Sequence, residues 1–290
     1  MKYIIVILII IMNITILSAE EYRIVDSRTG KTLSLQQMAN ELKKYDLIFF
    51  GEYHDNTTLH KLERELLPLL DTKRELILSL EMFERDVQSD LDAYIENWLT
   101  EDEFLAKSRP WSNYKDDYRP LIEYAKQKKL TVIAANIPRS IAGKMARTGP
   151  DFTDTLPEED KKWLPNKISY PDDSYKKAFL ETLENMHSPM MNNNPDWLYQ
   201  AQCLKDETMA ESIVNALKMK PKARVLHFNG DFHSRYFSGT VSRVQEILPK
   251  MKIAVISPSY SENWQTANLT AEEKNAGTYI IFLPIQGGEQ

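Results

Sequence analysis

Two segments far apart in the chain carry the same succession of residue types: glycine, acid, aromatic and histidine. They are Gly51-Glu52-Tyr53-His54 and Gly230-Asp231-Phe232-His233. Each follows an apolar run that is typical of a buried strand. The chain has only 9 Gly and 5 His, so two such phrases are not expected by chance. Carboxylates and imidazoles supply general acids, general bases and metal ligands, so the repeat predicts a chemical site.

The spacing within each phrase matters, because residues two positions apart project to the same side of an extended segment. If both segments stay extended, His54 and His233 border one hollow. Up to three carboxylates would lie beside them, namely Glu52, Asp231 and Glu81. Glu81 ends another apolar run, where an acid needs water or a partner, and this favours a site role. The glycine that opens each phrase allows a sharp turn or leaves room for a ligand.

Simpler interpretations exist for several of these residues. Glu52 and Asp231 could cap the helices that follow them, which does not exclude a ligand role. His60 and His187 are lone histidines, for which we expect the surface or a core position with satisfied hydrogen bonds. His227 lies inside an apolar run and is expected to be packed.

The motifs belong to an alternation of apolar runs and helical patterns. The apolar runs lie at 46–50, 75–80, 130–135, 224–228, 253–256 and 279–283, after an opening hairpin at 22–33. Helical patterns lie at 34–43, 57–70, 119–129 and 195–217, and Thr100 with Glu103 has the form of a capping box. This order predicts an α/β fold with a mainly parallel sheet and helices on both faces. Ligands bind such sheets beyond the carboxyl ends of the strands, which is where both phrases fall.

Two parts of the chain lie outside this alternation. Residues 148–194 are rich in Pro, Asp, Lys, Asn and aromatics, which predicts a helical insertion or cap and not an independent domain. Residues 1–19 combine Lys2, an apolar stretch and Ser18-Ala19, the pattern of a signal peptide. The apolar stretch is shorter than the roughly 20 residues that span a bilayer, although an uncleaved anchor remains the alternative. We therefore expect a single domain over residues 20–290.

The composition narrows the function further. The formal net charge is −6, which argues against nucleic-acid binding, because that needs a basic face. The only cysteine is Cys203, which is expected to be structural, and no cysteine near the cleavage site could take a lipid. We expect an exported protein that is periplasmic or associated with the outer membrane.

Several phrases, taken in order, resemble one family of proteins. They are Phe49-Phe50-Gly51-Glu52-Tyr53-His54-Asp55-Asn56, Leu80-Glu81-Met82-Phe83, Asp117-Tyr118-Arg119-Pro120, Ala135-Asn136-Ile137-Pro138-Arg139, Asp206-Glu207-Thr208-Met209-Ala210 and Asn229-Gly230-Asp231-Phe232-His233. Over residues 45–244 the chain is similar to the ChaN-type haem-binding proteins of the Tiki superfamily, which are bacterial iron-uptake proteins.

The resemblance implies a non-catalytic haem carrier that works as a homodimer, with an outer-membrane haem receptor as a further partner. Family members are thought to bind haem through a tyrosine at the dimer interface, and a phenolate is a hard donor that suits ferric iron. The candidates are Tyr114, Tyr118, Tyr170 and Tyr175. Arg139 and Arg235 are candidates for the haem propionates, because guanidinium groups match carboxylate geometry.

The same superfamily includes Tiki metalloproteases and erythromycin esterases, so a hydrolase is the alternative. In that case a divalent Zn, Mn or Co ion would be bound by residues among His54, His233, Glu52 and Asp231. Glu52 or Glu81 would then act as general base toward a bound water, and the two histidines would converge tightly on the ion. Catalysis without metal, by Glu81 and His54, is a third reading.

Overall fold

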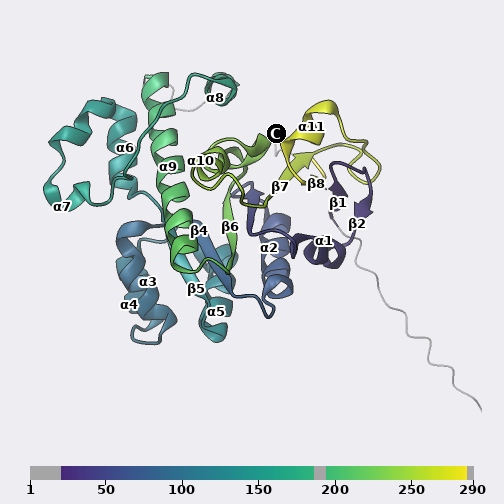
Figure 1. The fold of residues 1–290 in the computed structure, drawn as a ribbon, viewed down its shortest axis with the longest axis horizontal. Helices are drawn as coiled ribbons and strands as arrows, with labels where there is room; N and C mark the ends of the chain where they lie inside the picture. Colours follow the sequence, from purple (N-terminus) through teal and green to yellow (C-terminus); the bar gives the residue numbers. More distant parts are fainter. Residues whose placement is uncertain (1–20, 186–193, 286–290) are drawn as a thin grey trace, which may run out of the picture.

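The computed structural model describes residues 21–185 and 194–285 (Figure 1). The expected signal peptide lies outside these ranges, and so do residues 186–193 of the insertion, which include His187. The described chain forms one sheet of eight strands in the order β2-β1-β8-β7-β3-β6-β4-β5. β1 pairs antiparallel with β2 and β8, and the other neighbours are parallel. The prediction of a mainly parallel α/β sheet is confirmed.

The strands match the apolar runs of the sequence within a few residues. They are β1 (Arg23–Asp26), β2 (Thr32–Leu33), β3 (Leu47–Glu52), β4 (Leu76–Glu84), β5 (Thr131–Asn136), β6 (Arg224–Gly230), β7 (Ile253–Tyr260) and β8 (Tyr279–Leu283). The central strands β3, β4 and β6 are buried along their whole length. This explains why they are apolar on both faces and do not alternate with polar residues.

Helices cover both faces of the sheet. They are α1 (Leu35–Leu42), α2 (Thr57–Leu70), α3 (Gln88–Ile95), α4 (Glu101–Ser108), α5 (Arg119–Lys128), α6 (Arg139–Thr148), α7 (Glu158–Lys161), α8 (Ser174–Asn185), α9 (Pro195–Met219), α10 (Thr240–Ile247) and α11 (Ala271–Ala276). Ile48 and Phe50 of β3 pack in the core formed with α1–α5, whereas Leu47 and Phe49 pack with α9 and α10. None of the helices described is both long and apolar enough to cross a membrane.

Local signals in the sequence fix several helix starts. Thr100 accepts from the Glu103 backbone N–H while the Glu103 carboxylate accepts from the Thr100 N–H, so the predicted capping box is confirmed. Asn56 caps α2 in the simpler way, by accepting from the N–H of Leu59. This cap places the start of α2 directly after the first motif.

The insertion is helical, as predicted. It contains a 3₁₀ turn (Pro150–Thr155), α7 and α8, and its apolar residues pack with α6 and α9. Figure 1 shows α6, α7 and α8 around the N-terminal part of the long helix α9. The insertion thus rests on a helix that also covers the sheet.

The two edges of the sheet are closed in different ways. β2 forms one edge and is only two residues long. β5 forms the other edge, and there the side-chain amide of Gln88 donates to the Val132 carbonyl (2.9 Å) and accepts from the Ala134 N–H (2.8 Å). A side chain therefore takes the place of a neighbouring strand on β5.

Candidate functional site

The predicted site residues lie at the carboxyl ends of parallel strands. β3 ends at Glu52, β6 ends at Gly230, and β4 passes through Glu81 before it ends at Glu84. These ends meet at one edge of the sheet, where parallel α/β proteins bind their ligands. The side chains there form two groups, the Glu52 cluster and the His233 cluster, which are described in turn.

The Glu52 cluster consists of Glu52, His54, His60, Glu63 and Tyr118. Oε1 of Glu52 accepts hydrogen bonds from Nδ1–H of His54 and from the Tyr118 hydroxyl, both at 2.6 Å. Burial acts to raise the pKa of Glu52, but the hydrogen bond and the charge of His54 outweigh it and hold the pKa below its usual value. Burial and the charge of Glu52 raise the pKa of Tyr118 far above its usual value, so it remains a neutral donor.

His54 is the accessible member of this cluster. Its side chain is 44% exposed, and its ring packs edge-on against Trp111 at 4.8 Å. Burial alone would lower the pKa of His54, but the hydrogen bond to Glu52 raises it above its usual value. When His54 is neutral with its proton on Nδ1, its Nε2 is unprotonated, which is the arrangement of a general base oriented by a carboxylate.

His60 and Glu63, on the buried face of α2, complete the Glu52 cluster. Both are fully buried, and Nδ1 of His60 lies 3.2 Å from Oε2 of Glu63. Burial and the charge of Glu52 raise the pKa of Glu63 well above its usual value. Within residues 21–185 and 194–285, Glu52, His60 and Glu63 are the only group of three whose donor atoms all lie within 4.8 Å of one another, as a shared metal ion requires. His60 is thus a buried histidine with partners, one of the two positions expected for it.

The His233 cluster consists of His233, Glu81, Asp206 and Tyr175. Nδ1 of His233 lies 2.7 Å from Oδ1 of Asp206, and Nε2 lies 3.2 Å from Oε1 of Glu81. Burial acts to lower the pKa of His233, but the two carboxylates outweigh it and raise the pKa to about 9. His233 is therefore an imidazolium between two carboxylates at neutral pH.

Asp206 is itself held by two further hydrogen-bond donors and by one ion pair. The Tyr175 hydroxyl donates to Oδ2 (2.7 Å), the Thr240 hydroxyl donates to Oδ1 (2.8 Å), and Arg243 lies 3.8 Å from Oδ2. These partners come from the insertion and from α10, so Asp206 ties the cap to the site. Buried charges need such complete pairing.

Gly230 brings the two clusters together. Its N–H donates to Oε2 of Glu81 (2.7 Å), and a Cβ on Gly230 would lie 2.8 Å from Nε2 of His54. Glu81 thus binds His233 directly and is also stabilised by the charge of His54. Both histidines thus contact the Gly230–Glu81 region of the strand ends, and a hollow bordered by the two stays a prediction.

The second motif does not stay extended, which differs from the expectation. Residues 231–233 form a 3₁₀ turn, so Asp231 and His233 point to different partners. Asp231 accepts from the Ser257 hydroxyl (2.7 Å) and pairs with Arg235 (3.2 Å). Burial raises the pKa of Asp231 to about 6. Asp231 makes no described hydrogen bond to either histidine, and its proposed role as a metal ligand stays a prediction.

The haem-ligand candidates differ in accessibility. Tyr114, Tyr118 and Tyr175 are buried, whereas Tyr170 is half-buried beside the aromatic residues of the insertion. Burial raises the pKa of Tyr170 to about 12. The three buried hydroxyls could reach a porphyrin only after rearrangement, so Tyr170 is the candidate that this conformation favours.

The two arginine candidates both have carboxylate partners. Arg139 pairs with Glu84 and donates to the Arg109 carbonyl (2.7 Å), and its side chain is 54% exposed. Arg235 pairs with Asp231 and donates to the Pro258 carbonyl (3.2 Å). Their roles toward propionates stay predictions, and Arg139 is the more accessible of the two.

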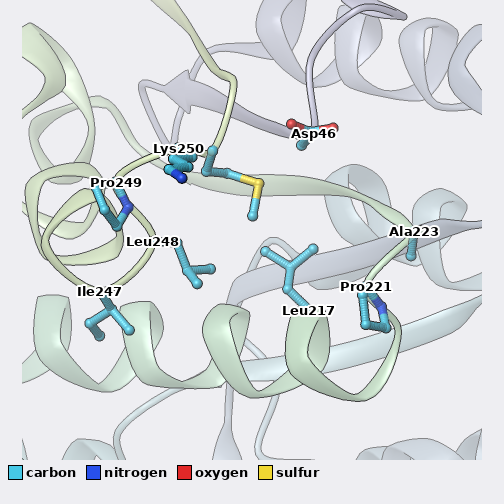
Figure 2. A pocket seen from close by; sticks show the side chains of 9 residues that line it. Asp46, Leu217, Pro221, Ala223, Ile247, Leu248, Pro249 and Lys250 are labelled. Carbon is cyan, nitrogen blue, oxygen red and sulfur yellow. The ribbon is translucent and has the colours of Figure 1, made fainter.

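Two cavities formed by the described residues lie away from these clusters. A cavity of about 400 Å³ opens at the amino ends of the strands, beside Asp46 and Ala223, and is lined by Leu217, Leu248 and Lys250 (Figure 2). A smaller one lies between α9 and α10. Neither cavity is lined by a residue at the carboxyl ends of the strands. The candidate site and the larger cavity are therefore separate.

Several site residues were not predicted from the sequence. Asp206 and Glu63 are acids on the buried faces of helices, and His60 lies three positions before Glu63 on the same face. An acid and a histidine with helical spacing within an apolar stripe are the signal that could have identified this pair. The other predicted packed residues, His227 and Cys203, are both fully buried.

The His233 cluster predicts a pH-dependent stability. The pKa of His233 in the folded state is about 9, which is above its usual 6.5. The stabilisation that the His233 imidazolium provides is therefore complete below pH 6.5 and is lost as the pH rises through 9. We expect the free energy of unfolding to fall by about 1–3 kcal/mol over this interval. Urea denaturation at a series of pH values measures it. In His233→Gln the decline should be much smaller, and an equal decline in both proteins would contradict the assignment.

Comparison with known proteins adds family and fold evidence. A family model described as "Haem-binding uptake, Tiki superfamily, ChaN" matches residues 38–244. The structure is similar to that of ChaN of Campylobacter jejuni, described as showing cofacial haem binding, with 19% identity and a TM-score of 0.68 over 91% of this chain and 98% of that one. It is also similar to the erythromycin esterase EreC in its open conformation, with 12% identity and a TM-score of 0.50 over 91% and 97%. No curated protein matches the chain.

Proposed function

We propose that this chain, which belongs to the ChaN family of haem-binding uptake proteins in the Tiki superfamily, carries haem without transforming it. The observation that supports this most is the extent of the family match. Residues 38–244 include both glycine-to-histidine motifs, the insertion and every strand from β3 to β6. The match therefore covers the complete site and its cap.

We further propose that two copies of the chain hold haem between their insertions. The related Campylobacter protein binds haem cofacially, as its description states, and a face-to-face pair of haems needs a surface on each side. On this chain Tyr170, Phe179 and Phe232 are half-buried and pack beside the buried Tyr175 and Tyr199. Aromatic rings of this kind pack well against a flat apolar ring system.

One tyrosine and one arginine of this chain have the chemistry and the exposure that a bound haem requires. Tyr170 has a half-buried phenol next to the aromatic group, and bound ferric iron would be ligated by its phenolate. Arg139 is exposed enough to reach a propionate, provided that it exchanges its partner Glu84. We assign these two residues as ligand and propionate partner.

The proposal predicts saturable haem binding by the purified chain lacking residues 1–19. Addition of hemin should produce a Soret shift that saturates, and Tyr170→Phe should weaken binding at least tenfold, because it removes the anionic ligand while leaving the ring. Tyr124→Phe is the matched control, since Tyr124 lies on α5 and binds Asp71, and it should bind as the wild type does. Sedimentation should show dimers in the presence of hemin. A wild-type spectrum without saturation would overturn the proposal.

A hydrolase is the second candidate, because His54 and Glu52 form an accessible base with an orienting carboxylate at 2.6 Å. The esterase-like fold is compatible with this but shows no activity by itself. Hydrolysis of simple esters by the wild type that disappears in His54→Ala would favour this candidate. Equal rates in both proteins would count against it.

We also propose that the protein is exported, with cleavage after Ala19, and that it works in the periplasm or at the outer membrane with a haem receptor. The support is the signal-peptide pattern of residues 1–19. Mass spectrometry of the protein purified from cell fractions tests this, and a chain beginning at Met1 in the cytoplasmic fraction would contradict it.

A further inference from the structure

Three side chains of the Glu52 cluster direct donor atoms toward one point between β3 and α2. They are Glu52, His60 and Glu63, and they are 1%, 0% and 0% exposed. The Oε2 atom of Glu52 and the Oε1 atom of Glu63 have no hydrogen-bond partner among the described residues. Unpartnered buried carboxylate oxygens are costly, so each needs an explanation.

The hydrogen bonds of His60 fix which of its nitrogens carries a proton. Nε2 lies 3.1 Å from the His54 carbonyl oxygen, which can only accept, so Nε2 is the donor. In the neutral ring Nδ1 is then unprotonated. Its lone pair is directed at Oε2 of Glu63 (3.2 Å) and Oε2 of Glu52 (3.6 Å). A carbonyl that holds the remote N–H is also the usual support of a metal-binding histidine.

Glu52 has the same division of roles between its two oxygens. Oε1 accepts from His54 and Tyr118, whereas Oε2 faces His60 without a hydrogen bond. Three lone pairs thus converge, and only a cation between them can remove their mutual repulsion. That cation is either a proton, held by a carboxyl or by Nδ1 of His60, or a metal ion.

We propose that Glu52, His60 and Glu63 bind a divalent metal ion. Ligands at about 2.1 Å from a tetrahedral ion lie about 3.4 Å from one another. The distances from Nδ1 of His60, 3.2 Å and 3.6 Å, bracket this value. Two carboxylates and a neutral imidazole also balance a charge of +2, so the buried site is electrically neutral.

The donor set indicates the class of ion and its role. Two oxygens and one imidazole nitrogen suit Zn²⁺ or Mn²⁺ more than Ca²⁺, which prefers oxygen alone. Because all three ligands are buried, the ion joins β3 to α2 and fixes Glu52, which in turn orients His54. This site shares Glu52 with the metal-ligand set expected from the sequence, but its other ligands are His60 and Glu63 in place of His54, His233 and Asp231. It does not rest on haem binding.

The test uses the mature chain and Zn²⁺ as the probe. The protein is unfolded in urea with EDTA, refolded with and without Zn²⁺, dialysed, and assayed for metal by mass spectrometry. We expect one Zn²⁺ per chain and a higher melting temperature of the Zn²⁺ form. Glu63→Gln, which keeps the shape and removes the anion, should lower Zn²⁺ affinity at least tenfold. Glu65→Gln is the matched control, because Glu65 lies exposed on the same helix.

Two outcomes would overturn the proposal. Retention of no Zn²⁺ by refolded wild type would mean that only a proton lies among the three side chains. Equal Zn²⁺ affinity in Glu63→Gln and wild type would place the ion elsewhere. Circular dichroism verifies that each variant folds. If Glu63→Gln does not fold, the visible spectrum of Co²⁺ bound to wild type decides, because oxygen and nitrogen ligands in a tetrahedral site give intense bands. A weak octahedral spectrum would contradict the proposed site.

Discussion

Replacement of Glu81 by leucine is expected to lower the free energy of unfolding by about 3–5 kcal/mol, because it removes one of the two carboxylates that pair with the buried His233 imidazolium and leaves the Gly230 N–H without an acceptor. Glu81 is buried and binds both the His233 imidazolium and the Gly230 N–H. The neighbouring charges hold its pKa far below the usual value despite burial, so the carboxylate is the form that the fold requires. Urea denaturation at neutral pH measures the loss.

Glu81→Gln separates the charge from the shape. Its amide oxygen can still accept from Gly230, so we expect a smaller loss of about 1–3 kcal/mol. The pKa of His233 should fall in this variant, and the decline in stability at alkaline pH should shrink accordingly. A glutamine variant as unstable as the leucine variant, with the wild-type pH profile, would show that packing and not charge is what Glu81 provides.

Gly51→Ala is expected to cost at least about 3 kcal/mol, at the upper end for overpacked cores. A Cβ at Gly51 would lie 2.4 Å from Oδ1 and 2.9 Å from Cα of Asp231, and 3.1 Å from the Ile256 carbonyl oxygen. Two of these atoms belong to the backbone, of the turn directly after β6 and of β7, so they cannot move independently of the sheet. Thermal unfolding followed by circular dichroism measures the effect.

Gly143→Ala is the matched control for this substitution. Gly143 lies within α6, and an added Cβ would meet only the guanidinium of Arg147, at 3.2 Å. This group is the end of a flexible side chain, so we expect a gain of up to about 1 kcal/mol from helix propensity. Similar losses in both variants would show that the close approach at Gly51 is not the cause.

The sequence was sufficient to predict the fold, because its signals are local. The stripe of leucines in 57–70 predicts α2 with the bounds that the structure has, although the residue that caps it is Asn56 and not Glu52. Likewise the apolar runs predict strands that are buried on both faces. The parallel order then brings Glu52, Glu81 and the second motif to one edge without further information.

The partners within the site could not be predicted in the same way. Asp206 reaches His233 from a helix 27 positions earlier in the chain, and no local pattern indicates which side chain it meets. The two motifs have the same residue types, yet only the second coils, with Asp231 bound to Ser257 of β7 and to Arg235. Neighbours in space, which a repeat cannot reveal, decided this difference.

The close contacts at Gly51 and Gly230 change the interpretation of these two motif glycines. Neither Gly51 nor Gly230 has a left-handed backbone. Each instead allows a side chain of the other motif to approach the backbone: Asp231 lies against Gly51, and His54 lies against Gly230. The glycine of each motif therefore leaves space for a side chain of the other motif. This reciprocal packing explains why both motifs begin with glycine.

The closed edges of the sheet limit how copies of the chain can associate. A two-residue β2 and a β5 whose carbonyl and amide are occupied by Gln88 offer little template for an added strand. Growth into open-ended fibrils by strand addition is therefore disfavoured at either side. The dimer proposed above would therefore use helical surfaces, and removal of the segment between α6 and α9 should abolish it while the sheet stays intact.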